Sequence, residues 1–159
     1  MQSSSGSNPS QVAARNCRRL QRELADLITG GIFHVEEGAA GSTRWVVKIR
    51  GAEGTFYHGE VFRLQFVFPP EYPIEAPEVV FLHPAPIHPH IYSNGHICLS
   101  ILYDGGWSPA LKVESVCLSI LSMLSSAEAK RPPEDNDNYV RTCSSSPKKT
   151  RWVFHDNKA

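Results

Sequence analysis

With 159 residues, the chain is long enough for one domain with a hydrophobic core and too short for two independent domains. Hydrophobic residues make up 41% of the chain and charged residues 20%, which is typical of a globular protein and excludes extensive disorder. The 16 basic side chains (Lys and Arg) balance 16 acidic ones, so the net positive charge that drives binding to nucleic acids or anionic membranes is absent.

Residues 1–11 are rich in Ser, Gly, Asn and Gln, and they predict a disordered tail ahead of a core domain over residues 12–159. The same segment lacks the apolar stretch of a secretory signal, and no run approaches the roughly eighteen apolar residues of a membrane span. We therefore expect an intracellular protein of the cytoplasm or the nucleus.

The first regular element predicted is an amphipathic helix that starts near Val12 and ends at Gly30 and Gly31. Its apolar residues recur at helical spacing and are expected to face the core: Leu20, Leu24, Leu27 and Ile28. The charged residues of the helix are expected to point elsewhere: Arg18, Arg19, Arg22 and Glu23.

Alternating apolar residues then predict strands over residues 44–49, 61–68 and 78–82, which indicate an antiparallel meander. Regular periodicity disappears between His83 and Ala110, and so long a loop in a small domain is typical of a functional site. An apolar stripe from Val113 to Leu124 predicts a second helix, which ends before Arg131.

The chain has four cysteines without metal-binding or redox spacing, which are expected to be free thiols: Cys17, Cys98, Cys117 and Cys143. Cys17 and Cys117 lie on the predicted helices, where packing is expected, and Cys143 lies in a polar segment. Cys98 lies in the long irregular loop, and this position together with the motif described next favours a nucleophile over a core residue.

The residues around Cys98 resemble the active-site signature of ubiquitin-conjugating enzymes, which combines His-Pro-Asn, Tyr-x-x-x-Gly-x-Ile-Cys-Leu and Trp-Ser-Pro-Ala. The corresponding segments here are His88-Pro89-His90, residues 92–99 and Trp107-Ser108-Pro109-Ala110. Tyr72-Pro73-Ile74 with Pro77, and residues 18–24 of the first helix, are also similar to the family. The triplet His-Pro-His and the segment Pro147-Lys148-Lys149-Thr150-Arg151-Trp152 resemble the W-type members.

The resemblance implies an α+β protein with the ubiquitin-conjugating (UBC) fold. This fold has an N-terminal helix, an antiparallel meander of about four strands, a long active-site loop and a central helix. Most members end with two further helices, but Pro132, Pro133 and the polar residues after them predict an atypical C-terminal segment from about residue 132. Trp152 and Phe154 in that segment are expected either to cover the core or to help receive substrates.

For function, the resemblance implies that Cys98 accepts ubiquitin from the activating enzyme (E1) as a thioester and passes it to an amine. W-type enzymes attach a single ubiquitin to the α-amino group of flexible protein N-termini. The implied partners are ubiquitin, E1, RING or U-box ligases (E3) and substrates with flexible N-termini. No bound cofactor is expected, since ATP is used by E1.

Three alternatives remain open at this point. The chain is compatible with a UBC-like binding module without activity, and with a conjugating enzyme that acts on lysines or carries a ubiquitin-like modifier. A cysteine hydrolase is the third alternative, although it needs a histidine base oriented by Asn or Asp.

The resemblance also implies roles for individual residues near Cys98. In the family, the Asn of the triplet and an acidic residue near the cysteine assist lysine substrates; His90 and Ser100 stand at these positions. His90 is expected to be an oxyanion donor or a structural residue rather than a base, and His88 is expected to fix the loop. Loss of the lysine assistance is compatible with α-amine substrates.

Partner contacts are implied on two surfaces. Arg18 and Arg19 match helix positions through which the family meets E1, although a solvated helix face is the common alternative. Four residues match the loops that the family presents to E3 ligases: Ile74, Ser108, Pro109 and Ala110. Ordinary turn packing is the alternative for Ile74. The histidines around Cys98 lack the spacing of a zinc site, so no metal is expected.

Overall fold

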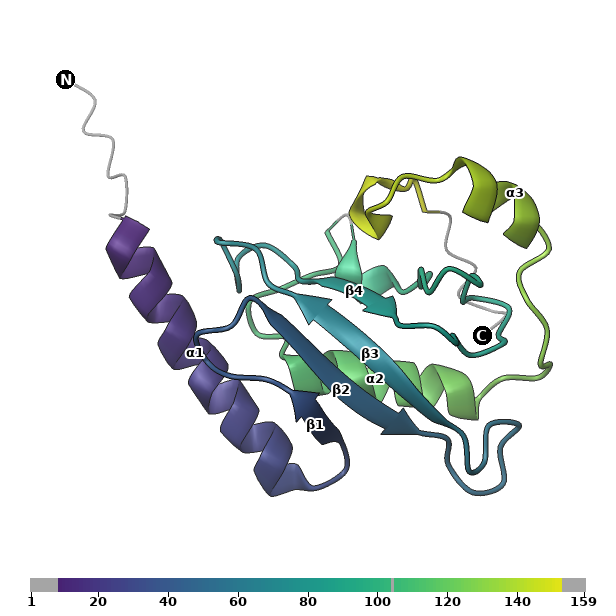
Figure 1. Ribbon diagram of the computed structural model, residues 1–159, viewed down its shortest axis with the longest axis horizontal. Helices are drawn as coiled ribbons and strands as arrows, with labels where there is room; N and C mark the ends of the chain where they lie inside the picture. Colours follow the sequence, from purple (N-terminus) through teal and green to yellow (C-terminus); the bar gives the residue numbers. More distant parts are fainter. Residues whose placement is uncertain (1–8, 104, 153–159) are drawn as a thin grey trace.

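The computed structural model describes residues 9–103 and 105–152, with side chains from Asn16 onwards (Figure 1). Its helices are α1 (Pro9–Gly30), α2 (Val113–Ser125) and α3 (Asn136–Thr142), with short 3-10 turns η1 (Ser100–Leu102) and η2 (Pro147–Lys149). Its strands are β1 (His34–Glu37), β2 (Arg44–Arg50), β3 (Val61–Val67) and β4 (Glu78–Phe81). The α+β class and the four-stranded meander are therefore as predicted.

The four strands form one antiparallel sheet in the order β1-β2-β3-β4. Pairing of β2 with β3 places Trp45 opposite Phe66 and Val47 opposite Leu64, and all four side chains are fully buried. Because alternate residues of a strand point to the same face, this register gives the sheet one apolar face.

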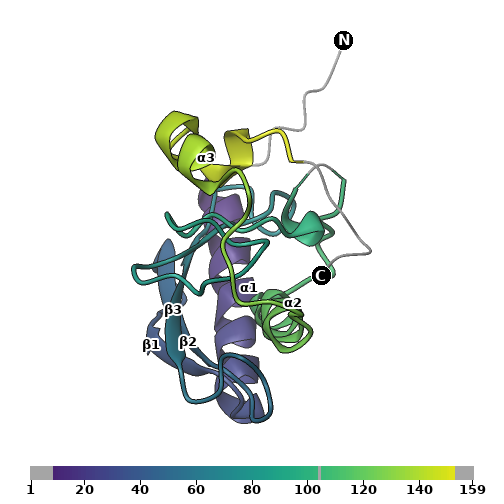
Figure 2. The ribbon, with the colours of Figure 1, turned by 90° about the vertical axis from the view of Figure 1, so that its right-hand side faces the viewer.

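Helices α1 and α2 lie on the same side of the sheet and cover this apolar face (Figure 2). Leu20 and Leu27 of α1 join Val116 and Ile120 of α2 in the core, each with less than a twentieth of its surface exposed. Burial of an aliphatic side chain of this size stabilises a fold by about 1.5–3 kcal/mol. The sheet is therefore held by two helices, and the long loop runs between β4 and α2.

Helix α1 differs from its predicted pattern at three places. It begins at Pro9, so residues 9–11 are helical rather than part of a tail, and residues 1–8 lie outside the described residues. Glu23 is 2% exposed although it was expected to face away from the core, while Ile28 is 66% exposed. The physical reason is helix geometry, because residues 20, 23, 24 and 27 share one face and residue 28 lies beside it.

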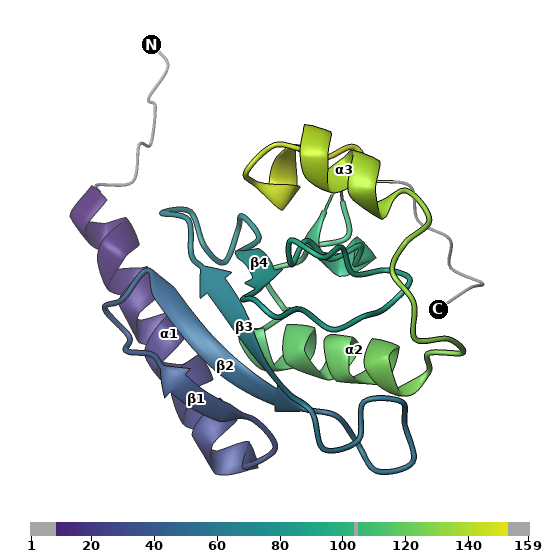
Figure 3. The same cartoon turned by 45° about the vertical axis from the view of Figure 1, so that its right-hand side comes forward.

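The C-terminal segment lies across the long loop and β4 instead of packing on the helices (Figures 1 and 3). Within the described residues it holds one seven-residue helix, α3, and the turn η2. Two long helices are not present in this part of the chain, in agreement with the predicted atypical ending.

Candidate active site around Cys98

Cys98 directly follows a tight turn in the long loop. The amide of Tyr92 donates to the His96 carbonyl at 2.9 Å, and the amide of Gly95 donates to the Tyr92 carbonyl at 2.9 Å. Gly95 has a φ of 91°, and a Cβ at this position would lie 2.0 Å from the Phe81 carbonyl oxygen. The turn therefore lies tightly against the backbone of β4. This contact fixes the position of Cys98, which follows the turn in the chain.

His90 and Cys98 lie side by side because the Cys98 amide donates to the His90 carbonyl at 2.9 Å. Both residues are half-buried, and both line a pocket of about 500 Å³. The remaining lining residues come from the loop and from the C-terminal segment: Pro89, Tyr92, Arg131, Pro133, Glu134, Asp135, Tyr139, Thr150, Arg151 and Trp152. The structure thus brings together two of the predicted catalytic residues, on one wall of a pocket.

His88 is fully buried and uses both ring nitrogens inside the protein. Its Nε2 lies 3.1 Å from the Met123 carbonyl of α2, and its Nδ1 accepts a hydrogen bond of 2.9 Å from the His90 amide. Burial lowers the pKa of His88 to about 4, so the ring is neutral at physiological pH. A neutral imidazole with a proton on Nε2 satisfies both contacts, and it ties the loop to α2 beside His90.

Ser100 is exposed and begins the turn η1, and the carboxylates that line the pocket come from elsewhere. They belong to Glu134 and Asp135, which the sequence reasoning missed. The Tyr92 hydroxyl donates to the two carboxylate oxygens of Asp135 at 3.0 and 3.2 Å. Burial, followed by this hydrogen bond, raises the pKa of Tyr92, so the phenol stays protonated and remains a donor.

Aromatic rings join the C-terminal segment to the loop. The Tyr92 and Tyr139 rings stack with centroids 3.8 Å apart, and the Tyr103 and Trp152 rings stack at 5.1 Å. Trp152 also packs against the hydrophobic core, as one of the two predicted alternatives requires. Phe154, for which the same alternatives were expected, lies outside the described residues.

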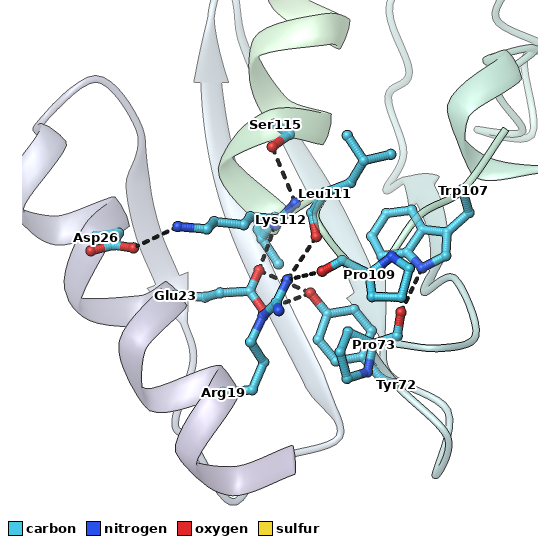
Figure 4. Close-up of polar contacts among 11 residues, drawn as sticks. Arg19, Glu23, Asp26, Tyr72, Pro73, Trp107, Pro109, Leu111, Lys112 and Ser115 are labelled. Atoms are coloured by element: carbon cyan, nitrogen blue, oxygen red, sulfur yellow. Dashed lines mark hydrogen bonds and ion pairs between the residues drawn. The ribbon is translucent and has the colours of Figure 1, made fainter. Parts of the chain in front are cut away.

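Arg19, which is half-buried, and Glu23, which is buried, form a polar knot that joins α1 to the loops around α2 (Figure 4). The Glu23 carboxylate accepts from Arg19 Nε at 3.0 Å, from the Tyr72 hydroxyl at 2.6 Å and from the Val113 amide at 2.7 Å. Arg19 also donates to the carbonyl oxygens of Pro109 at 2.7 Å and Leu111 at 2.9 Å. The Arg19 guanidinium therefore makes hydrogen bonds within the protein, which its expected place on a solvent-facing helix surface did not predict.

Comparison with known proteins agrees with the motif and with the fold. A family model described as ubiquitin-conjugating enzyme matches residues 19–154. The chain belongs to the ubiquitin-conjugating enzyme family. The predicted UBC fold and the enzyme class are thereby confirmed, and membership implies ubiquitin, an activating enzyme and a ligase as partners in general.

Individual relatives of this conjugating enzyme include W-type proteins. It is 56% identical to Ubiquitin-conjugating enzyme E2 W of Caenorhabditis elegans over 145 residues, which cover 88% of this chain and 95% of that one. It is 52% identical to Ubiquitin-conjugating enzyme 15 of Arabidopsis thaliana over 164 residues, which cover 99% of each chain. The crystal structure of the conjugating enzyme UbcA1 from Agrocybe aegerita matches with a TM-score of 0.77 and 42% identity, over 84% of this chain and 98% of that one.

The predicted ligase-binding residues of this conjugating enzyme lie on two exposed loops. Ile74 is 74% exposed, which argues against ordinary turn packing for its side chain. The other three residues are also exposed: Ser108, Pro109 and Ala110. Trp107 Nε1 donates to the Pro73 carbonyl at 2.7 Å and joins the two loops. Of the two predicted E1-contacting residues, Arg18 is exposed, whereas Arg19 belongs to the polar knot with Glu23.

The remaining cysteines differ in their surroundings. Cys117 is buried in α2 as predicted, and burial raises the pKa of its thiol. Cys17 was expected to pack, but it is exposed, because its position on α1 turns away from the sheet. Cys143 is half-buried, and its sulfur accepts a hydrogen bond of 3.3 Å from the Asn94 amide of the active-site loop.

Residues 9–103 and 105–152 hold neither a metal-ligand cluster nor a helix that could span a membrane. No three side chains of His, Cys, Asp or Glu in this part of the chain are grouped so that they would hold a metal ion. In the same ranges, every helix is too short or too polar to cross a membrane.

Proposed function

We propose that Cys98 accepts the C-terminus of ubiquitin as a thioester and transfers it to the α-amino group of flexible protein N-termini. The observation that carries this proposal is the half-buried Cys98 beside His90 on the wall of a pocket of about 500 Å³. A fully buried sulfur would leave no route for the C-terminus of a second protein. The similarity to Ubiquitin-conjugating enzyme E2 W of Caenorhabditis elegans agrees with the W-type resemblance of the sequence, and this resemblance implies the α-amine substrate class.

The first step exchanges one thioester for another. The Cys98 thiolate attacks the carbonyl carbon of the thioester on E1, the new S–C bond forms, and the E1 thiolate leaves with the electrons of the broken bond. Both bonds are thioesters of similar energy, so the acyl group stays activated. No cofactor on this chain is needed, because ATP is consumed earlier by E1.

In the second step, a neutral amine attacks the same carbonyl carbon and the Cys98 thiolate leaves. The amine nitrogen then loses its extra proton to solvent or buffer, and an amide remains. At pH 7 the unprotonated fraction is roughly 0.1–0.2 for an α-amine and roughly 0.0004 for lysine, from their reference pKa values. The α-amine is therefore favoured by some hundreds to one before the enzyme contributes anything.

The side chains near Cys98 fit this amine selectivity. His90 stands where an Asn assists lysine substrates in the family, and Ser100 stands where an acidic residue is common. We propose that His90 donates to the oxyanion that forms when the amine attacks. His88 holds the loop and does not act as a base, since both of its nitrogens are engaged in the folded protein.

Incubation with E1, ATP and ubiquitin tests the first step. We expect a thiol-sensitive adduct that is lost in Cys98→Ala and retained in Cys17→Ala, a matched control in which an exposed cysteine is removed. Absence of an adduct in the wild-type protein would favour an inactive binding module. An adduct that water hydrolyses as fast as it forms would favour a hydrolase.

Discharge of the purified adduct tests the second step. We expect faster loss of ubiquitin to a peptide with a free N-terminus than to the same peptide with an acetylated N-terminus and one lysine. Equal or reversed rates would refute the α-amine proposal and favour an enzyme that acts on lysines. Parallel charging with ubiquitin-like proteins identifies the modifier.

A further inference from the structure

A guanidinium of helix α1 holds the loop that leads into α2, which consists of residues 107–111 (Figure 4). Arg19 Nη2 donates to the carbonyl oxygens of Pro109 at 2.7 Å and Leu111 at 2.9 Å, so one nitrogen bonds to the loop at two points. Arg19 Nε donates to Glu23 at 3.0 Å, and this ion pair fixes the plane of the guanidinium. A planar donor with fixed N–H directions therefore sets the path of the 107–111 loop.

Glu23 extends the same network to a second loop. Its buried carboxylate accepts from the Tyr72 hydroxyl at 2.6 Å and from the Val113 amide at 2.7 Å. Trp107 Nε1 donates to the Pro73 carbonyl at 2.7 Å and closes the ring of contacts. Helix α1, residues 72–74 and residues 107–113 are therefore fixed to one another by hydrogen bonds between segments that are distant in the chain.

The two loops expose small and apolar residues, which are the ones expected to contact a ligase. Ile74 is exposed on the first loop, and Ser108, Pro109 and Ala110 are exposed on the 107–111 loop. A partner that binds this surface needs both loops in one arrangement, because Ile74 and Pro109 belong to different segments. Order that exists before binding spares the partner the free energy of imposing it.

We propose that Arg19 is a positioning residue for ligase-stimulated ubiquitin transfer, because it fixes the 107–111 loop beside Ile74 before the ligase binds. This inference rests on the proposed function, in which Cys98 carries the ubiquitin. Arg19 acts through the loop and takes no part in bond making. The Arg19 guanidinium points to the loop carbonyls, whereas the neighbouring Arg18 is exposed. Of the two arginines, Arg18 is therefore the one available to E1.

Order in the loop is measured first, without ligase or E1. The Leu111 amide donates to the Ser108 carbonyl at 2.9 Å, so its hydrogen exchange, followed by NMR, reports how often the loop opens. In Arg19→Ala we expect this exchange to be about tenfold faster or more, because two hydrogen bonds from a charged donor are lost. The increase should exceed what global unfolding accounts for, as measured on amides of β2 and β3. Arg18→Ala removes the same charge from an exposed position and is the matched control.

Ligase binding is measured next. The probe is an isolated RING or U-box domain that binds the wild-type protein and loses affinity in Ile74→Ala, so that it reports on this surface. If the loop holds its binding arrangement about a tenth of the time in Arg19→Ala, the Kd rises about tenfold. We expect that rise, with the Kd of Arg18→Ala within about twofold of wild type. Arg19→Lys keeps the charge beside Glu23 but loses the planar fork, so it should raise the Kd in the same direction. It replaces Arg19→Ala if that variant does not fold.

Ubiquitin transfer separates this role from a contact with E1. In Arg19→Ala we expect the rate of charging by E1 and the rate of discharge without ligase to stay within about twofold of wild type. Ligase-stimulated discharge should need about tenfold more ligase domain to reach half of its maximum. The maximum itself should match the wild type, because a saturating ligase restores the arrangement of the loop.

Other results would overturn the inference. A Leu111 amide that keeps its wild-type exchange rate in Arg19→Ala overturns the anchoring of the loop, and a loosened loop with a wild-type ligase Kd overturns its role in binding. Charging that falls about tenfold with an unchanged ligase Kd makes Arg19 an E1 contact instead. Equal acceleration of exchange in the loop, β2 and β3 means general destabilisation and also overturns it. If no RING or U-box domain binds through Ile74, the inference fails while a Cys98 adduct leaves the proposed function standing; absence of that adduct refutes the proposed function.

Discussion

Protonation of His88 is expected to destabilise the folded protein over a pH range that its surroundings define. The His88 ring is fully buried, and its Nδ1 accepts from the His90 amide, so a proton on Nδ1 breaks this contact and places a charge in the core. Burial lowers the pKa of His88 in the folded protein from 6.5 to about 4. The unfolded chain retains the ordinary value.

The sign and size of the effect follow from proton linkage. Between pH 6.5 and about 4 the unfolded chain binds the proton of His88 and the folded protein does not, so acid favours unfolding. The stabilisation from neutral His88 is fully present above pH 6.5 and is lost as the pH falls toward 4. The difference between 6.5 and about 4, at about 1.36 kcal/mol per unit, amounts to roughly 3 kcal/mol.

Urea unfolding at pH steps from about 7 to about 4.5 measures this contribution as the difference between wild type and His88→Gln. A glutamine amide can donate to the Met123 carbonyl and accept from the His90 amide, but it does not titrate. The other acidic and basic groups are the same in both proteins and cancel in the difference. His58→Gln, which alters an exposed histidine, is the control. If the free energy of unfolding falls equally with pH in wild type and His88→Gln, the argument is wrong.

Three further predictions concern the core and the loop. Glu23→Ala removes the acceptor of two buried donors, the Tyr72 hydroxyl and the Val113 amide, and one of the partners of Arg19, so urea unfolding should show a loss of about 3–5 kcal/mol. Gly95→Ala forces a Cβ to within 2.0 Å of the Phe81 carbonyl oxygen at a φ of 91°, and the free energy of unfolding should fall by at least about 2 kcal/mol. Cys117 is buried and its thiol pKa is raised, so iodoacetamide should leave it unmodified in the folded protein, as peptide mass spectrometry can verify.

Strands and helices with a buried face were predictable from local sequence, whereas the exposed edge strand β1 was not. Strand β3 and helix α2 carry regular apolar spacing because each packs one side on the core. Strand β1 carries His34, Glu36 and Glu37, and its burial pattern is mostly exposed. It exists because its backbone pairs with the edge of β2, and no side-chain pattern records that pairing.

In the functional loop, too, local features were predictable from the sequence and contacts with distant segments were not. The motif around Cys98 predicted which residues lie together, because those residues are neighbours in the chain. It did not predict that Arg19 donates to Pro109, 90 positions away, or that Glu134 and Asp135 line the pocket with Cys98. Such contacts depend on how distant segments pack. The C-terminal segment from Pro133 to Trp152 is mostly polar and has no periodicity from which a packing surface could be inferred. Its aromatic residues Tyr139 and Trp152 pack against each other, with ring centroids 5.7 Å apart.

The long loop has little regular secondary structure, yet Cys98 has a fixed position. The reason is that hydrogen bonds join the loop to neighbouring elements at several points. His88 ties its first half to α2, Trp107 bonds to the Pro73 carbonyl in the neighbouring loop, and the Pro109 carbonyl accepts from Arg19 of α1. These three ties are made by the side chains of His88, Trp107 and Arg19, and the side chain of His90 is not part of them. Residues beside Cys98 can therefore differ, as His90 differs from the Asn of the family motif, without loss of the loop's position. The side chain of His90 at the pocket wall can therefore change while the ties that hold the loop to the core stay the same.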